Sequence, residues 1–269
     1  MSQWNRLLLN VGAWEGSFTQ LSPAGVLRED IPSVVTLQAT SDNKTMRQTI
    51  AKGRGSDRRE QVLEYSTLSR SIYFFETGAF CQGSLQLGPF STFGAETGFL
   101  HGDRRLRLVQ LFYGGTQLSQ ITLIREHLQG SGAQPQPQLT VGDLLGTWQG
   151  QATTYYADLH SDQYATRLTI TQQGNRVTQA LTLPGRTLTS DATIDGQALR
   201  FGEGETAMQV LLLPGGASST TPLKLPKGQA FFLEAGWLIS PTLRQRMIRR
   251  YDSQGTWEAL TLVTEEKQD

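Results

Sequence analysis

The chain has 269 residues, in which 24 Lys and Arg balance 24 Asp and Glu. This length suits one large domain or two ordinary ones, and the zero net charge argues against partners such as nucleic acid. A single cysteine, Cys81, excludes an intramolecular disulfide and a cysteine metal cluster. The sequence shows neither a signal peptide nor an apolar run long enough for an integral membrane segment. We therefore expect a cytoplasmic or plastid-stromal protein.

The first pattern in the chain is Gly-x-Trp-x-Gly, formed by Gly12, Trp14 and Gly16 after a short helix predicted over residues 4–9. The same pattern returns near the middle of the chain with Gly146 and Trp148, again after a short helical turn. A Trp flanked by glycines is typical of a place where backbones approach closely. We therefore interpret both motifs as structural.

Two further matches follow in the same order and at nearly the same displacement along the chain. Glu96-Thr-Gly-Phe-Leu100 aligns with Glu234-Ala-Gly-Trp-Leu238, and Ile121–Glu126 aligns with Leu260–Glu265. Ordered matches at slowly drifting offsets predict a duplicated unit. The stretch 129–138, rich in Gly, Ser, Gln and Pro and including Pro135, is typical of a linker. We predict domains over 1–130 and 138–269.

Most of each half indicates β-structure. Short segments with alternating or continuous apolar residues are separated by Gly-rich and Asn-Gly or Asp-Gly turn signals, and long helical periodicity is absent. Strands are predicted over 33–38, 61–65, 71–75, 105–111, 165–172, 177–183, 208–213 and 260–264. Many short strands in a unit of this size predict an all-β fold of two tandem antiparallel barrels.

The stretch from Glu234 to Tyr251 predicts a hairpin that turns at Ser240-Pro241 and carries an unusual concentration of arginine. Side chains alternate along a strand, so Arg244 and Arg246 share one face while Arg249 and Tyr251 share the other. Arg244 and Arg246 lie either inside the barrel, as anion ligands, or on a solvated outer face. Their counterparts in the first half are Arg105 and Arg107, in phase with an apolar series that would face inward. A β-bulge, indicated by the drift in the offset between the halves, could change this phase in the second half.

A short helical turn, a Gly-x-Trp on the first strand and a meander of strands resemble the lipocalin and fatty-acid-binding (calycin) families. Through the segments Asn10–Gly25 and Glu234–Tyr251, the whole chain is similar to a two-domain cyanobacterial and plastid family of unknown function. The segment Trp237-Leu-Ile-Ser-Pro-Thr-Leu-Arg-Gln-Arg246 looks like the matching segment of the S-type phycobiliprotein lyases. In the calycins the motif tryptophan closes one end of the barrel, which is what the resemblance implies for Trp14 and Trp148.

The lyase resemblance implies a pocket in the second barrel for a linear tetrapyrrole (bilin). Arg244 and Arg246 would clamp its propionates, because guanidinium pairs well with carboxylates, and Trp237 would form a wall. An acid near the pyrrole nitrogens is also implied, with Asp191, Asp195 and Glu234 as candidates. The protein would act as a chaperone or lyase-like factor in pigment–protein assembly, with a phycobiliprotein as partner; whether it is an enzyme stays open.

Two alternatives remain. Arg249 and Tyr251 match the Arg-x-Tyr that holds a carboxylate in fatty-acid-binding proteins, which predicts a lipid carrier. Filled barrels would instead predict a non-catalytic interaction or assembly scaffold.

The histidines His101, His127 and His160 show no ligand spacing, and no catalytic set can be proposed from spacing. We therefore expect no metal and assign no catalytic residue or certain cofactor.

Overall fold

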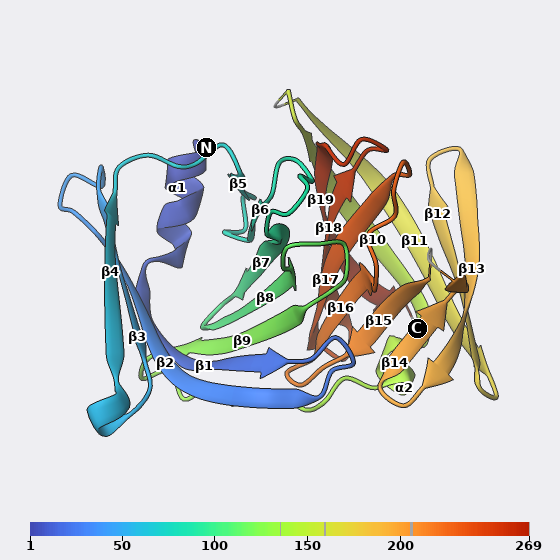
Figure 1. The fold of residues 1–269 in the computed structure, drawn as a ribbon, viewed down its shortest axis with the longest axis horizontal. Helices are drawn as coiled ribbons and strands as arrows, with labels where there is room; N and C mark the ends of the chain where they lie inside the picture. Colours follow the sequence, from blue (N-terminus) through green and yellow to red (C-terminus); the bar gives the residue numbers. More distant parts are fainter. Residues whose placement is uncertain (135, 159, 205–206, 269) are drawn as a thin grey trace.

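The computed structural model describes residues 1–134, 136–158, 160–204 and 207–268. They form an all-β molecule with a nine-stranded sheet in the first half and a closed ten-stranded barrel in the second (Figure 1). Pro135 of the predicted linker and Asp269 of the predicted second domain lie outside the described residues. None of the helices in the described part of the chain is long and apolar enough to cross a bilayer.

The N-terminal sheet has the order β4-β3-β2-β1-β9-β8-β7-β6-β5, with antiparallel neighbours throughout. It curls into a half-barrel that stays open between β4 and β5, and α1 lies at this opening (Figure 1). The elements are α1 (Gln3–Leu7), the 3-10 turn η1 (Leu8–Asn10), β1 (Gly12–Leu21), β2 (Leu27–Ala39), β3 (Met46–Lys52), η2 (Gly55–Asp57), β4 (Arg59–Tyr65), β5 (Ile72–Phe74), β6 (Phe80–Gly83), β7 (Phe93–His101), β8 (Arg104–Phe112) and β9 (Gln120–Leu128).

In the C-terminal half each strand pairs with the next, and β10 pairs with β19 to close the barrel. The short helix α2 begins with a capping box between Thr140 and Asp143, which satisfies backbone N–H groups at the helix start. The elements are α2 (Val141–Leu144), β10 (Gly146–Tyr156), β11 (Ser161–Gln173), β12 (Arg176–Leu183), β13 (Arg186–Asp195), β14 (Ala198–Phe201), β15 (Met208–Leu212), β16 (Ala217–Pro222), β17 (Phe231–Ser240), β18 (Leu243–Tyr251) and β19 (Trp257–Gln268).

The all-β prediction is confirmed, with one difference in the first half. Its sheet follows the predicted meander but does not close, because β4 pairs only with β3 and β5 only with β6. Strand β4 is exposed on both faces except at Tyr65, and its apolar residues Val62 and Leu63 stay 41% and 40% exposed because no closing strand covers them. A closed barrel therefore forms only in the second half.

The largest group of buried apolar side chains joins the two halves, and we call it the seam core. It includes Phe93 of β7, Phe112 of β8, Phe231 of β17 and Tyr251 of β18. The ring of Phe93 lies 5.8 Å from that of Phe231 and 4.9 Å from that of Tyr251, measured between centroids. Smaller cores lie inside each half, around Trp14 and Trp148.

Candidate functional site

The predicted β17–β18 hairpin directs Arg244 and Arg246 into the barrel, where they line a cavity of about 280 Å³. Both guanidiniums bind the buried carboxylate of Glu265. Arg244 donates from Nη2 at 2.6 Å and Arg246 from Nη2 at 2.8 Å. Arg246 also reaches Glu234 at 3.4 Å. We call Glu234, Arg244, Arg246 and Glu265 the C-terminal charge cluster.

The first half repeats this arrangement. Glu126 accepts hydrogen bonds from Arg105 Nε at 2.7 Å and Arg107 Nη2 at 2.9 Å, and Arg107 Nη1 donates to Glu96 at 2.8 Å. We call these four residues the N-terminal charge cluster. Its members stand at the positions that align with the C-terminal charge cluster in the sequence matches. Arg244 and Arg246 therefore point into the barrel as Arg105 and Arg107 point into the half-barrel, and the inward and outward faces of the strand are the same in both halves.

The motif tryptophans lie against these clusters. Trp148 is fully buried, its indole Nε1 donates to the Leu144 carbonyl at 2.9 Å, and the Arg244 guanidinium lies 4.5 Å from its ring centroid. Trp14 donates to the Asn10 carbonyl at 2.9 Å, and Arg105 lies 4.6 Å from its ring centroid. Each tryptophan thus connects the short helical segment to the charged interior and shields one guanidinium from water.

The two central glutamates are ionised despite their burial. Burial alone would raise the pKa of Glu265, but Arg246 and Arg244 outweigh it and lower the pKa below its ordinary value. Glu126 shows the same balance with Arg107 and Arg105. Each cluster contains two guanidiniums and two carboxylates, so its formal charge is zero. The interior arginines therefore already have anionic partners from the chain itself.

Arg249 and Tyr251 point away from the barrel interior. They lie in the seam core, where Arg249 Nη2 donates to the carbonyls of Gly83 and Ser84 at 3.2 and 3.1 Å. The Tyr251 hydroxyl donates to the Ser84 carbonyl at 3.0 Å, and Arg249 Nε donates to the Tyr251 oxygen at 2.8 Å. This pair therefore connects β18 to the end of β6 and the residue that follows it, in the other half of the molecule.

Trp237 also lies at the junction of the halves. Its indole N–H donates to Gln136 Oε1 at 3.1 Å and to the Gly215 carbonyl at 3.2 Å, and its ring lies 6.3 Å from that of Phe99. Among the candidate acids, Glu234 is in the C-terminal charge cluster. Asp191 and Asp195 instead form ion pairs with Arg176 and Arg200, and both carboxylates are substantially exposed.

Three interior features were not predicted from the sequence. Glu126 and Glu265 were present in the aligned stretches Ile121–Glu126 and Leu260–Glu265, so the duplication itself carried a signal for them. A cavity of about 430 Å³ lies in the N-terminal half-barrel, with the N-terminal charge cluster at one side and apolar side chains such as Phe18 and Phe74 around it. Lys52 of β3 also lines this cavity, and no sequence pattern marked it.

The glycines of the motifs have distinct structural tasks. Gly12 and Gly146 have φ angles of +145° and +111°, which favour glycine. The second glycines, Gly16 and Gly150, allow close packing with β9 and β19. A Cβ at Gly150 would lie 2.8 Å from both Glu265 Cγ and Thr166 Oγ1.

Two family models match the chain, one for each half. Residues 1–131 match the domain of unknown function DUF3598, N-terminal, and residues 135–268 match the C-terminal domain of biogenesis factor required for ATP synthase 1. No curated protein matches the chain.

Solved structures extend the comparison. A protein of unknown function from the DUF3598 family of Nostoc punctiforme is 47% identical, with a TM-score of 0.95 over 100% of both chains. The S-type phycobiliprotein lyase CPES of Guillardia theta is 11% identical, with a TM-score of 0.39, covering 48% of this chain and 90% of that one. A transferrin binding protein B mutant of Haemophilus parasuis is 9% identical, with a TM-score of 0.26 over 96% of this chain and 76% of that one. Because the Nostoc protein is 47% identical over the whole chain and is a member of the DUF3598 family, this chain belongs to the DUF3598 family.

Proposed function

We propose that this protein is a non-catalytic assembly factor for a multisubunit complex, with ATP synthase as the first complex to test. The observation that carries the proposal is the match of residues 135–268 to a domain named for ATP synthase biogenesis. That match covers β10 to β19, the whole closed barrel. The function would then be protein recognition during assembly.

The geometry of the barrel supports a role that does not depend on a large interior ligand. Arg244 and Arg246 are neutralised by Glu265 and Glu234. An anion entering the cavity would have to displace these carboxylates or leave them buried without partners, which is costly. The cavity of about 280 Å³ is also slightly below the range of roughly 300–1,000 Å³ typical of small-molecule sites.

A direct binding experiment tests the assembly role. The purified full chain is mixed with each soluble ATP synthase subunit from the same organism, one at a time, and complexes are measured by light scattering after gel filtration. We expect a stable complex with at least one subunit. In the organism, deletion of the gene should reduce assembled ATP synthase and leave unassembled subunits. Failure of both results would reject ATP synthase as the target.

A second candidate function, the binding of an amphipathic anion, is favoured by Lys52. Its ammonium lies 3.6 Å from the Phe18 ring centroid, and within the described parts of the chain no carboxylate pairs with it. Burial and the nearby Arg107 lower the pKa of Lys52, and together they outweigh the Glu96 carboxylate, which raises it. Ala152 stands where Phe18 stands in the first half, and Leu183, one residue beyond the last β11–β12 pair, falls at the position of Lys52. The fold itself therefore does not require this lysine.

The ligand of this second candidate would combine an apolar body with a carboxylate, as bilins and fatty acids do. If it were a bilin, a phycobiliprotein would be the natural acceptor. Titration with a bilin should shift its visible absorption, whereas a fatty acid should displace a fluorescent lipid probe. Lys52→Leu should weaken binding in the half-barrel at least about tenfold. Binding that instead requires Arg244 and Arg246 would place the ligand in the barrel, and a requirement for Arg249 and Tyr251 would place it at the seam.

A further inference from the structure

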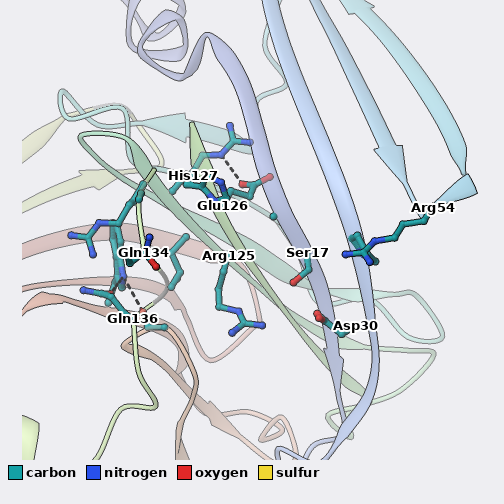
Figure 2. Close-up of a pocket in the computed structure, with 16 residues that line it drawn as sticks. Ser17, Asp30, Arg54, Arg125, Glu126, His127, Gln134 and Gln136 are labelled. Atoms are coloured by element: carbon teal, nitrogen blue, oxygen red, sulfur yellow. Dashed lines mark hydrogen bonds and ion pairs between the residues drawn. The ribbon is translucent and has the colours of Figure 1, made fainter. Parts of the chain in front are cut away.

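A second cavity, of about 300 Å³, lies outside both barrel interiors, where the N-terminal sheet meets the barrel. We call it the seam pocket. Its walls come from β1, β2, β8 and β9, the segment after β3, the residues Ala133, Gln134 and Gln136, and Gly215 with Trp237 of the second half. Figure 2 shows Arg125 in the middle of this pocket, with Ser17 and Asp30 on one side and Gln134 and Gln136 on the other.

Three arginines line the seam pocket without an ion pair. Arg125 Nη2 donates to the Thr19 hydroxyl at 3.0 Å, and its Nε is buried without a hydrogen-bond partner. Arg104 Nη2 donates to the Ile239 carbonyl at 3.1 Å, and its guanidinium lies 5.6 Å from the Trp237 ring centroid. Arg54 is exposed at the rim. In the described part of the chain, none of the three has a carboxylate within ion-pair distance.

The acidic groups at the seam pocket do not neutralise these arginines. Glu126 lines the pocket but binds Arg105 and Arg107 within the N-terminal charge cluster. The Asp30 carboxylate accepts a hydrogen bond from the Thr19 hydroxyl at 2.6 Å. Three guanidiniums against one carboxylate leave a formal excess of two positive charges at the pocket. A dianion would match this excess.

The duplicated half shows that the fold does not need these cations. In the alignment of the two halves, Arg104 and Arg125 correspond to Leu243 and Thr264. The two charge clusters, by contrast, are the same in both halves. Residues that build the common core are therefore shared between the halves, whereas Arg104 and Arg125 belong to the first half alone.

The seam pocket also holds Arg125 in a defined position. The stem of Arg125 packs against Gly215, which has a φ of +77°. If Gly215 carried a Cβ atom, that atom would lie only 2.9 Å from Arg125 Cδ. A glycine of the second half thus gives room to an arginine stem from the first half. The pocket exists only when the two halves are packed together.

We propose that the seam pocket binds a phosphomonoester dianion. Guanidinium groups pair strongly with phosphate oxygens, and the pocket supplies guanidiniums from β8, from β9 and from the segment after β3. The Ser17 hydroxyl adds a donor on β1 (Figure 2). This proposal does not rest on the assembly role, because its observations are the arginines of the seam pocket that lack an ion pair.

Titration calorimetry at low ionic strength tests the proposal, with inorganic phosphate and glycerol phosphate as probes and chloride as the ionic-strength control. We expect saturable binding of at least one probe. Each of Arg125→Gln and Arg104→Gln should weaken it at least tenfold, whereas Arg47→Gln, at an exposed arginine that pairs with Glu64, should leave it unchanged. Tighter binding of glycerol phosphate would indicate that the pocket also contacts the ester.

Thermal melting provides a second readout and shows that the variants fold. Phosphate should raise the melting temperature of the wild type and of Arg47→Gln, and raise that of Arg125→Gln and Arg104→Gln much less at the same concentration. Two results would overturn the proposal: no saturable binding of either probe, or equal binding by the wild type and both pocket variants.

Discussion

At the residue scale, the main finding is that the arginines of the central strands are buried with their own counterions. The sequence predicted the inward pairs Arg105/Arg107 and Arg244/Arg246 as one of two alternatives, because strand alternation places residues i and i+2 on one face. It did not predict their partners. The carboxylate of Glu265 binds Arg244 from the neighbouring strand, and strand register is set by the whole sheet.

Removing one of these carboxylates should be strongly destabilising. Glu265→Gln would leave two buried guanidiniums without their main anion, and breaking a buried ion pair in this way costs about 3–5 kcal/mol. Urea unfolding followed by fluorescence measures the loss. Glu258→Gln is the matched control, because Glu258 forms a half-exposed pair with Arg250 at 3.6 Å, and it should change stability by less than about 0.5 kcal/mol. Equal effects of the two changes would contradict the structural role of the cluster.

The same glutamates predict how stability depends on pH. The folded-state pKa values of Glu126 and Glu265 are lowered, whereas the unfolded value is about 4.3. Their stabilising contribution is therefore complete above about pH 4.3 and is lost as the pH falls through the folded-state values. Melting temperatures between pH 7 and pH 3 should decline in this acid range. The decline should be shallower for Glu265→Gln, and an unchanged slope would argue against the prediction.

At the scale of single elements, the motif Gly-x-Trp-x-Gly marks the place where a short helical segment ends and a strand begins. The first glycine takes a positive φ, the tryptophan reaches back to the helical segment, and the second glycine lets β10 approach β19. Every strand predicted from alternating or continuous apolar residues is present. Strand β13, with the sequence RTLTSDATID, was not predicted, because only two of its ten residues are large and apolar.

The second glycine of the motif should resist substitution. In Gly150→Ala the new methyl group would press on Glu265 and Thr166, and such overpacking costs about 1–3 kcal/mol. Gly142→Ala is the control, because that glycine lies in α2 with its nearest neighbour 3.7 Å from the added Cβ. It should be neutral or stabilise by up to about 1 kcal/mol. Calorimetry on both variants would decide, and tolerance of Gly150→Ala would contradict the close packing.

At the scale of the whole molecule, the two repeats share the seam core rather than standing as separate barrels. The duplication and the all-β class could be predicted, because ordered motif matches and strand patterns are local features of the sequence. The open half-barrel and the seam pocket could not. They depend on which outer faces meet, and the apolar side chains of β7, β8 and β17 have the same pattern whether they face a barrel interior or a neighbouring domain.

The seam core predicts that the halves remain together when the chain is cut. A protease site introduced at Gly130–Gly132 should allow cleavage between the halves, yet the two fragments should elute as one species in gel filtration. Uncleaved protein should unfold in a single calorimetric transition. As a control, cleavage followed by urea should release two fragments. Separate elution of native fragments would show that the interface is weak.

The only thiol of the chain lies inside this interface. Cys81 has no exposed surface; Thr97 lies 3.8 Å and Arg249 4.0 Å from its sulfur, and burial raises the pKa of the thiol. A thiol-reactive dye can therefore reach it only when this region opens, and the labelling rate gives the frequency of that opening. Labelling should be slow for the native protein and faster for Arg249→Leu, which removes the hydrogen bonds to Gly83 and Ser84. The chain thus carries a built-in probe of how often its two repeats separate.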